Sequence, residues 1–422
     1  MNAVILSVGD EVVAGQIVDS NAAWLAEQLL ELGVEVIRHE AVRDAEDEVE
    51  AAIRAAAPRC HLIVVSGGLG PTEDDLTRHG VAQAAGVGLE LDDASLEHIE
   101  ERFRRYGRQM PPRNRIQAMI PVGATVLPNS QGTAPGFVCC CDDTCVAVLP
   151  GVPREMKAMF TSHLKPFIEA MPLERHTVRV ERLKLFGLPE SGVNQTIRHF
   201  MQREANPLIG LLVSHGVISV KFTATARSQH EAEALIRPVR ESCHRLLGEA
   251  VFGTGDDTLH GVAAALLERQ GKTLAVAESC TGGLIGHYLT EVPGISRFLL
   301  EDLVTYSNAS KIDLLGVPAD TIAAVGAVSE QVAAAMAEGV RRRAKADIGL
   351  STTGIAGPTG GSAEKPVGLV YCGLASDEGT RVERLKFVGA RTVVKDRAAK
   401  AALNIVRLYL QHLGDWSAQE KT

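Results

Sequence analysis

The sequence predicts an α/β protein in three parts: a mainly parallel α/β domain over residues 1–171, a small α+β domain over 172–253, and a second α/β domain over 258–413. Three observations support this organisation. The 422 residues exceed what one ordinary hydrophobic core accommodates. Apolar, strand-like runs alternate with amphipathic helical patterns in the first and last parts. The 40 glycines suit a chain with many tight strand-to-helix turns.

Charge and composition exclude several classes of protein. The net charge of -9 argues against a nucleic-acid binder, which needs clustered Lys and Arg to neutralise phosphates. The start of the chain reaches Asp10 and Glu11 without a basic segment, and no apolar run approaches membrane-spanning length. We therefore expect a cytoplasmic protein that binds small molecules and no membrane. The eight cysteines include no Cys-x-x-Cys pair, so we expect reduced, structural thiols.

The first part opens with a βαβ pattern. A strand over residues 3–8 precedes a helix over 21–32 that Gly33 stops, and a strand follows over 34–37. A helix over 46–57 then leads to a strand over 61–65. This alternation predicts a mainly parallel sheet.

A glycine-rich loop continues directly from that last strand. Such loops lie at the carboxyl ends of strands, where open α/β sheets bind ligands, and glycine lets backbone N–H groups approach a phosphate. The predicted ligand residues here are Ser66, Gly67, Gly68, Gly70, Thr72 and Thr77, and a second loop adds Gly132 and Thr133. Asp74 and Asp75 are candidate ligands for a divalent cation. The alternative is a tight turn in which an aspartate caps the next helix.

The middle part reads as strand, helix, strand, strand, helix between residues 177 and 247. It lacks the Gly-x-x-Gly loop of RNA-binding KH domains, so we expect a structural or dimerising spacer, and a homodimer. Residues Gly253–Asp257 read as a hydrophilic linker. The basic stretch Arg102–Arg108 is interpreted as a solvated helical face rather than a phosphate clamp.

The last part contains a third set of strand-to-loop junctions. A helix over 258–270 ends at Gly271, and a strand then runs into Ser279. A strand over 299–306 precedes Lys311, Ser329 caps a helix over 330–344, and a strand over 348–353 enters a glycine-rich loop. Two further strands, over 367–375 and 380–387, precede the closing helix.

Ser279 is the candidate nucleophile of this part. Serine needs a nearby base, and a lysine serves only when desolvation lowers its pKa, so Lys311 and Tyr306 are the candidate partners. Thr281, Gly282 and Gly283 are candidate donors to an oxyanion, and the loop with Gly354, Gly357 and Gly360 is a candidate phosphate cradle. The alternatives are that Ser279 only caps a helix and that Cys280 is the nucleophile, although no histidine partner for Cys280 is evident.

These motifs resemble those of a known family. Val8–Glu11, Gly15–Asn21, Ser66–Thr77, Gly132–Gly136 and Pro150–Met156 are similar to the molybdopterin-binding-like domain of the CinA (competence/damage-inducible) family. Ala277–Gly283, Val304–Asn308 with Lys311, Gly326–Glu330, Thr353–Gly361 and Glu364–Gly368 resemble its carboxyl-terminal nicotinamide-nucleotide amidase domain. In place of Gly-Thr-Glu the chain has Gly9–Asp10–Glu11, and in place of Gly-Asp-Arg it has Gly389–Ala390–Arg391.

The resemblance implies two activities. The first is an amidase of pyridine-nucleotide salvage that converts nicotinamide mononucleotide to nicotinic acid mononucleotide and ammonia without a cofactor. Its catalytic residues would be Ser279, Tyr306 and Lys311, with Asn308, Thr353 and Arg391 joining the substrate-binding set. The second is divalent-metal-dependent hydrolysis of ADP-ribose by the N-terminal domain. The alternative for that domain is a non-catalytic module that binds a pterin or a nucleotide.

Overall fold

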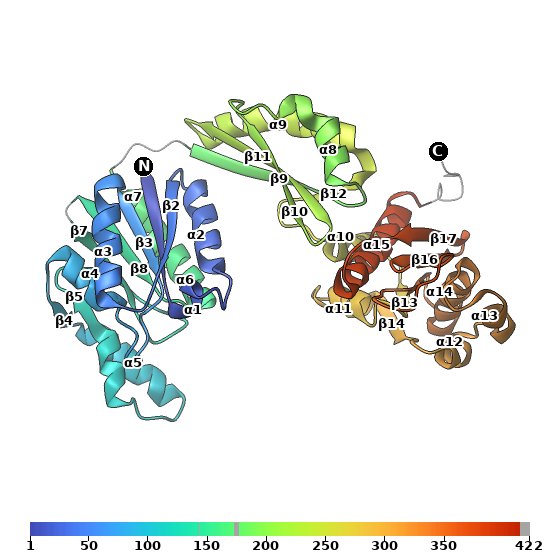
Figure 1. Cartoon of the computed structure of the whole chain (residues 1–422), viewed down its shortest axis with the longest axis horizontal. Coiled ribbons are helices and arrows are strands. Elements are labelled where there is room, and N and C mark those ends of the chain that lie inside the picture. The colour runs from blue at the N-terminus through green and yellow to red at the C-terminus, as the bar shows by residue number, and fades with distance from the viewer. Residues whose placement is uncertain (142, 173–176, 414–422) are drawn as a thin grey trace. The chain divides into compact units, whose positions relative to one another are not determined.

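The computed structural model describes residues 1–141, 143–172 and 177–413 (Figure 1). The chain forms two compact units. One comprises Met1–Arg179 with Ala224–Glu233, and the other comprises Val180–Thr223 with the described residues from Ala234 onward.

The N-terminal part is a three-layer α/β/α structure. Its six-stranded sheet has the order β2-β1-β3-β8-β7-β6. The strands are β1 Asn2–Val8, β2 Glu35–Val42, β3 Leu62–Ser66, β6 Thr125–Leu127, β7 Gly136–Cys141 and β8 Thr144–Leu149, and β4 Leu89–Leu91 pairs with β5 Met119–Pro121 in a separate ribbon. The pairs β1–β2, β1–β3 and β3–β8 are parallel, whereas β8–β7 and β7–β6 are antiparallel. The prediction of a mainly parallel sheet is confirmed.

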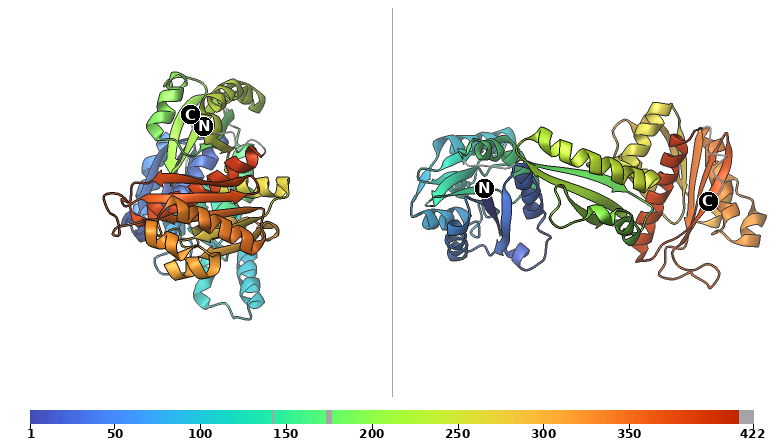
Figure 2. Two further views of the ribbon diagram at one scale, coloured as in Figure 1. Left: turned by 90° about the vertical axis from the view of Figure 1, so that its right-hand side faces the viewer. Right: turned by 90° about the horizontal axis from the view of Figure 1, so that it is seen from above.

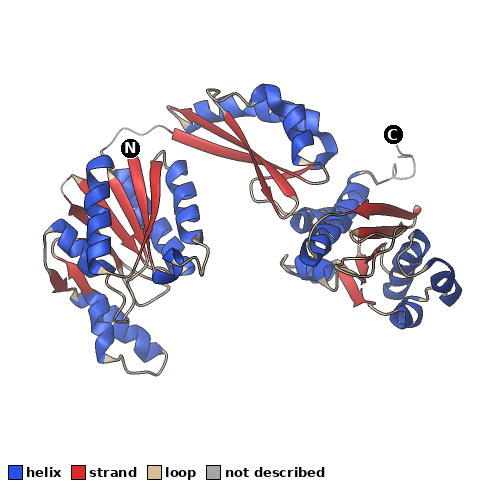
Figure 3. Cartoon of the chain, viewed as in Figure 1, coloured by secondary structure: helices blue, strands red, loops and turns tan. Residues whose placement is uncertain are grey.

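Helices cover both faces of this sheet (Figure 3). They are α1 Asp10–Val13, α2 Ser20–Glu31, α3 Glu46–Ala56, α4 Thr77–Ala85, α5 Asp93–Arg105, α6 Pro153–Met159 and α7 Lys165–Ala170, with short helical turns at Ala57–Arg59, Pro112–Ala118 and Phe160–Leu164. Alternate residues of each central strand enter opposite cores, because successive side chains of a strand point to opposite faces. Ile5 and Val64 pack with Leu25 and Leu29 of α2, while Leu6 packs with residues of α3 and α4.

The middle part is a four-stranded sheet in the order β10-β11-β9-β12. Its elements are β9 Thr177–Leu185, α8 Glu190–Ile197, a turn at Arg198–Phe200, β10 Leu208–Ser214, β11 Val217–Ala226, α9 Gln229–Leu247, a turn at Gly248–Ala250 and β12 Val251–Thr254. The predicted order of elements is confirmed. The linker prediction is wrong at its start, because Gly253 and Thr254 pair with Lys184 and Leu183 of β9.

The C-terminal part is a five-stranded sheet in the order β14-β13-β15-β16-β17, with helices on both faces (Figure 2). Its strands are β13 Leu274–Glu278, β14 Leu299–Val304, β15 Ile348–Gly354, β16 Leu369–Ser376 and β17 Gly379–Lys386. Its helices are α10 Leu259–Gln270, α11 Leu284–Thr290, α12 Asn308–Leu315, α13 Ala319–Val325, α14 Glu330–Ala344 and α15 Arg391–Gln411, with a short turn at Ile295–Arg297.

Strand β13 lies between two parallel neighbours, β14 and β15. The carboxyl ends of these three strands therefore meet at one edge of the sheet, which places Ser279 and Thr305 beside Gly354, the last residue of β15. The predicted ends of two helices are confirmed: Gly271 closes α10 in a left-handed conformation, and the Ser329 side chain caps α14. None of the described helices combines the length and apolar character needed to cross a bilayer.

Candidate functional site

The Ser279 hydroxyl meets a buried lysine. Lys311 Nζ lies 3.0 Å from Ser279 Oγ and donates to the Thr305 carbonyl oxygen at 2.7 Å. Only 1% of Lys311 and 8% of Ser279 is exposed to solvent. Burial lowers the pKa of Lys311, because an ammonium loses hydration in the protein interior. A lysine so placed can take the proton of a serine, which a solvated surface lysine cannot do at neutral pH.

Helix α12 delivers Lys311 to this position. Ser307 caps the helix, and its side chain and that of Ser310 bond reciprocally to each other's backbone N–H. The Thr305 N–H donates to the Glu278 carbonyl oxygen at 2.8 Å, which fixes the start of the β14–α12 loop beside the end of β13. The contact between Ser279 and Lys311 is thus positioned by the capped start of α12 and by a backbone hydrogen bond to the end of β13.

Glu278 braces the turn that carries Ser279. Its carboxylate is fully buried and accepts hydrogen bonds from the N–H groups of Gly283, Ile285 and Gly286 at 2.8–3.0 Å. These are N–H groups of the first turn of α11, which have no partner within the helix. Its sequence signal is an acidic residue at the end of a buried apolar strand.

A second carboxyl group accompanies Glu278. Asp302 lies on β14 opposite Val276, and its Oδ1 is shielded from solvent without a hydrogen-bond partner among the described residues. Burial and the nearby Glu278 charge raise the pKa of Asp302 to about 7. A side chain at Gly286 would collide with Asp302, because its Cβ would lie 1.9 Å from Oδ2. The turn that carries Ser279 therefore packs tightly against two carboxyl groups, those of Glu278 and Asp302.

The predicted oxyanion donors need correction. Gly283 donates its N–H to Glu278, so the prediction that it faces an oxyanion is wrong. The Thr281 hydroxyl is 2.7 Å from Thr352 Oγ1 and is buried, so it also points away from ligand. The N–H groups of Thr281 and Gly282 donate no hydrogen bond within the described residues. Gly282 and Gly283 have φ of 64° and 90°, a conformation that favours glycine.

Tyr306 lies apart from the serine and the lysine. It is 61% exposed, and its hydroxyl accepts a hydrogen bond from Arg391 at 2.8 Å. Arg391 also donates to the Gly357 carbonyl oxygen at 2.8 Å, so the tyrosine, the arginine and the glycine-rich loop form one connected group. Among the two predicted bases, Lys311 has the contact with Ser279.

The other predicted residues of this site take different positions. The Thr353 hydroxyl is buried and donates to the Ala327 carbonyl oxygen at 2.8 Å, and its role in substrate binding stays a prediction. Asn308 is exposed at the start of α12. Gly354 ends β15, and Gly357 and Gly360 have φ of 81° and 88° in the loop beyond it. Burial raises the pKa of the Cys280 thiol to about 12, in agreement with a packed, unreactive thiol.

The N-terminal glycine-rich loop borders a second cavity of about 610 Å³. Gly67 and Gly68 have φ of 115° and 64°. A Cβ at Gly67 would lie 2.2 Å from the Val8 carbonyl oxygen, and one at Gly68 would lie 2.0 Å from Thr77 Oγ1. Both positions therefore require glycine. Of the predicted ligand residues, Gly67, Gly68, Gly70, Asp74, Asp75 and Thr133 line this cavity.

Two of the predicted residues, Asp75 and Ser66, make hydrogen bonds that support this loop. Asp75 accepts the N–H groups of Gly70 and Thr72 at 2.6 and 2.8 Å and also the Thr72 hydroxyl. Both of its carboxylate oxygens are therefore engaged within the loop, and its role as a metal ligand stays a prediction. The Ser66 hydroxyl accepts from Asn21 at 3.0 Å.

Thr77 and Gly132 also lie behind the cavity surface. Thr77 is fully buried, and a Cβ at Gly132 would overlap the Glu155 carboxylate.

A buried arginine that sequence reasoning missed holds the same loop. Arg78 is 1% exposed and donates to the Leu69 carbonyl oxygen at 2.7 Å and to that of Gly70 at 3.5 Å. Burial lowers its pKa to about 10. The residue follows Thr77 at the start of α4 and has no sequence signal that separates it from a surface arginine.

Carboxylates gather around the second cavity. Besides Asp74 and Asp75 it is lined by Glu11, Asp44 and Glu155. Burial raises the pKa of Asp44, and the nearby charges of Glu11, Asp10 and Asp74 raise it further. The Thr72 hydroxyl lowers the pKa of Asp74. Within the described ranges, no group of three or more His, Cys, Asp or Glu side chains has a geometry ready to hold a metal ion.

Family models match three stretches of the chain. The model described as "CinA C-terminal domain" matches residues 256–410, and "Probable molybdopterin binding domain" matches 4–170. The model described as "Damage-inducible protein CinA KH domain" matches 181–253, the segment that we interpreted as a spacer because it has no Gly-x-x-Gly loop.

Relatives match along nearly the whole chain. A "Putative competence-damage inducible protein" of Caldanaerobacter subterraneus is 41% identical over 411 residues, which cover 97% of this chain and 99% of the relative. A "CinA-like protein" of Anaeromyxobacter sp. is 45% identical over 410 residues, covering 96% and 98%. A crystal structure of "the protein CinA with unknown function" from Thermoplasma acidophilum is 38% identical and covers 39% of this chain and 96% of that one, with a TM-score of 0.37. By its full-length identity to these relatives, the chain belongs to the CinA family of competence-damage inducible proteins.

Proposed function

We propose that the chain is a nicotinamide mononucleotide amidase that releases ammonia and nicotinic acid mononucleotide. The observation that carries the proposal is the contact of 3.0 Å between the buried Lys311 Nζ and Ser279 Oγ. Two features support it. The N–H groups of Thr281 and Gly282 donate no hydrogen bond within the part of the chain that the structure describes, and Tyr306, Arg391 and Gly357 form a connected group. The identity of the substrate rests on the family resemblance.

In the proposed reaction, Ser279 Oγ attacks the carbonyl carbon of the carboxamide while the neutral Lys311 amine takes the hydroxyl proton. The C–N bond then breaks, Lys311 returns that proton to the leaving nitrogen, and ammonia departs from an ester of Ser279. A water molecule attacks the ester, again giving a proton to Lys311, which passes it to Ser279 as the acid is released.

Two parts of the turn serve this chemistry in different ways. The N–H groups of Thr281 and Gly282 are the donors available to the developing oxyanion. Glu278 stabilises the conformation of the turn. Because it accepts the N–H of Gly283, that group is not available to the oxyanion, which is left with the N–H groups of Thr281 and Gly282.

The test is ammonia release from nicotinamide mononucleotide by the full-length protein and by the variant Ser279→Ala. The wild type should release ammonia in amounts equal to the nicotinic acid mononucleotide formed, and the variant should release none above background. Cys280→Ala is the matched control and should retain activity, since the Cys280 thiol is held protonated. Release by the Ser279→Ala variant at the wild-type rate would refute the assignment.

A second activity is proposed for the N-terminal cavity, namely hydrolysis of ADP-ribose to AMP and ribose phosphate with a divalent cation. The observation that favours it is that the carboxylates Glu11, Asp44, Asp74 and Glu155 line one cavity. The charges of Glu11 and Asp74 raise the pKa of Asp44, and a cation would relieve that repulsion. A bound divalent ion would neutralise pyrophosphate charge. Gly67 and Gly68 would let the backbone approach that pyrophosphate.

Product analysis with ADP-ribose and Mg²⁺ or Mn²⁺ tests this second activity. Calorimetry that shows tight binding of ADP-ribose or a pterin without turnover, under every cation tried, would instead support the binding-module alternative.

A further inference from the structure

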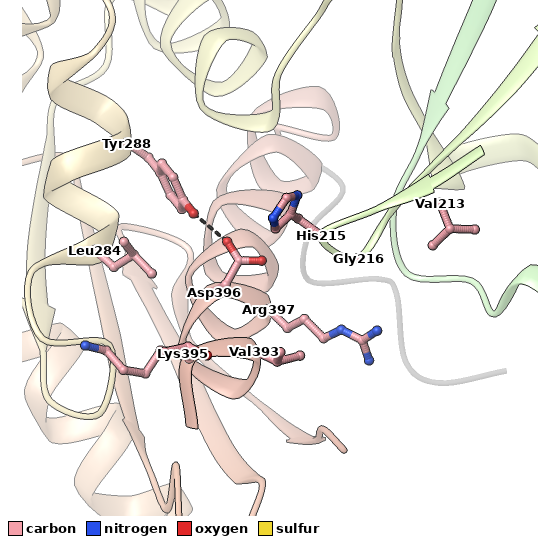
Figure 4. Close-up of a pocket in the computed structure, with 10 residues that line it drawn as sticks. Val213, His215, Gly216, Leu284, Tyr288, Val393, Lys395, Asp396 and Arg397 are labelled. Atoms are coloured by element: carbon pink, nitrogen blue, oxygen red, sulfur yellow. Dashed lines mark hydrogen bonds between the residues drawn. The ribbon is translucent and has the colours of Figure 1, made fainter. Parts of the chain in front are cut away.

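A cavity of about 680 Å³ lies within the second unit (Figure 4). It is lined by Leu284, which directly follows the turn Ser279–Gly283, but not by Ser279 or Lys311. Leu284 and Tyr288 of α11 and residues of the first turns of α15 form its inner wall. The tip of the β10–β11 hairpin forms its outer wall, with Val213, His215 and Gly216. Its size is in the range of small-molecule sites, and part of its wall comes from the segment that we interpreted as a spacer.

The hairpin tip is a defined structure and is fastened in place. His215 and Gly216 both have positive φ, 48° and 77°, as a two-residue hairpin turn between Ser214 and Val217 requires. The His215 carbonyl oxygen accepts from Lys400 Nζ at 2.8 Å. Lys400 is also 2.9 Å from Asp396, which in turn accepts the Tyr288 hydroxyl. The outer wall is therefore tied to α15 and through it to α11.

The charges around the cavity favour an anion. Asp396 is already engaged by Lys400 and Tyr288. Lys395 and Arg397 also line the cavity and form no ion pair or hydrogen bond within the described residues. They extend from opposite sides of α15, Lys395 below Leu284 and Arg397 toward the hairpin (Figure 4). These two cations, beside the apolar side chains of Val213, Leu284 and Val393, suit a ligand that is both anionic and partly apolar.

Lys395 lies close to Gly282 in the turn Ser279–Gly283. A Cβ placed on Gly282 would lie 3.4 Å from Lys395 Nζ, so the ammonium sits against the turn. Among the described residues, the N–H groups of Thr281 and Gly282 at this turn have no acceptor. Lys395 also follows Arg391 by four residues in α15, which places both cations on the same face of the helix.

We propose that this cavity is the phosphate subsite of the amidase, with Lys395 binding the substrate phosphate and the β10–β11 hairpin closing the site from outside. The ligand class is a nucleoside monophosphate that carries its carboxamide to Ser279. The middle segment is then part of the substrate site. This inference rests on the proposed amidase function.

Binding and turnover of nicotinamide mononucleotide and of nicotinamide riboside, which lacks the phosphate, test the subsite. Lys395→Met should lower kcat/KM for the mononucleotide about 30-fold and change that for the riboside less than about twofold. Lys386→Met removes an exposed lysine of β17 and is the matched control. Equal losses on both substrates in Lys395→Met would refute the subsite.

The hairpin wall has its own matched pair of variants. Val213 lines the cavity, whereas its neighbour Leu212 does not and, on a strand, points to the opposite face. Val213→Asp should weaken mononucleotide binding about tenfold by opposing the phosphate, and Leu212→Asp should leave it unchanged. The same effect from both variants would contradict a role for the wall.

Calorimetry on Ser279→Ala, which cannot turn over, separates this inference from the proposed function. Tighter binding of the mononucleotide than of the riboside, abolished by adding Lys395→Met, supports the subsite even if the wild type releases no ammonia. Equal affinity for the two ligands refutes it even if the amidase is active.

Discussion

The two glycine-rich turns of this protein have similar backbones, but a buried carboxylate supports one and a buried guanidinium supports the other. The turn after β13 and the loop after β3 each follow a buried strand and contain two successive glycines with positive φ. Behind the first lies buried Glu278, which accepts from N–H groups. Behind the second lies buried Arg78, which donates to carbonyl oxygens.

This difference decides which backbone groups remain for a ligand. Glu278 consumes N–H groups at the start of α11 and leaves those of Thr281 and Gly282. Arg78 instead donates hydrogen bonds to the carbonyl oxygens of Leu69 and Gly70. Only the first turn also has a serine in contact with a buried amine. Similar turns therefore leave different groups at their surface, a serine beside a buried amine in one domain and carboxylates around a cavity in the other.

The largest effect is expected from removing Lys311, whose contact with Ser279 distinguishes the first turn from the second. Lys311→Met should reduce ammonia release by about 10³-fold or more, since the serine then has no base. In the wild type kcat should rise with pH through the lowered pKa of Lys311, because only the neutral amine accepts a proton. The pH–rate profile between pH 6 and 10 checks this. Lys345→Met, on an exposed lysine, should behave as the wild type. A profile that falls over this range would contradict Lys311 as the base.

The next largest effect is expected from removing Glu278, the carboxylate that supports the first turn. Glu278→Ala leaves three N–H groups without their acceptor, and we expect a loss of about 3 kcal/mol in the free energy of unfolding. Urea denaturation measures this loss. Glu268→Ala, which removes an exposed carboxylate of α10, should cost less than about 0.5 kcal/mol. An equal cost for the two variants would show that Glu278 does not support the turn.

The corresponding change behind the second turn should cost somewhat less. Arg78→Met removes the donors to the loop carbonyls but keeps much of the buried aliphatic volume, so we expect about 2 kcal/mol of destabilisation. Binding of ADP-ribose should weaken while ammonia release stays at the wild-type level. Calorimetry and the ammonia assay on the same preparation check both results. Loss of amidase activity in this variant would contradict the independence of the two turns.

The smallest effect is expected for Tyr306→Phe. The variant loses only the hydrogen bond from Arg391, so kcat/KM should fall about threefold with little change in the pH–rate profile. Steady-state kinetics from pH 6 to 10 measures both. A loss of about 10³-fold with an altered profile would return Tyr306 to the proton-transfer role that the family resemblance implies.

Much of the fold could be predicted because it depends on local patterns. Apolar runs such as Leu274–Glu278 define strands, and Gly271 and Ser329 end or begin helices through their own backbone and side-chain chemistry. The start of the predicted linker failed for the opposite reason. Gly253 and Thr254 have a turn-like composition, and only pairing with β9, some seventy residues earlier, makes them a strand.

For the candidate site, the sequence alone determined where the loops lie and which side chains have reactive chemistry: Ser279 after a buried strand, a lysine thirty-two residues later, and glycines where the backbone must turn. Only the tertiary structure decided which groups are used. Burial removes the hydration of Lys311 and lowers its pKa. The Gly283 N–H, the Thr281 hydroxyl and the Asp75 carboxylate are engaged by hydrogen bonds to neighbours within the protein. Solvation and hydrogen-bond partners depend on residues distant in sequence, and a local pattern does not contain them.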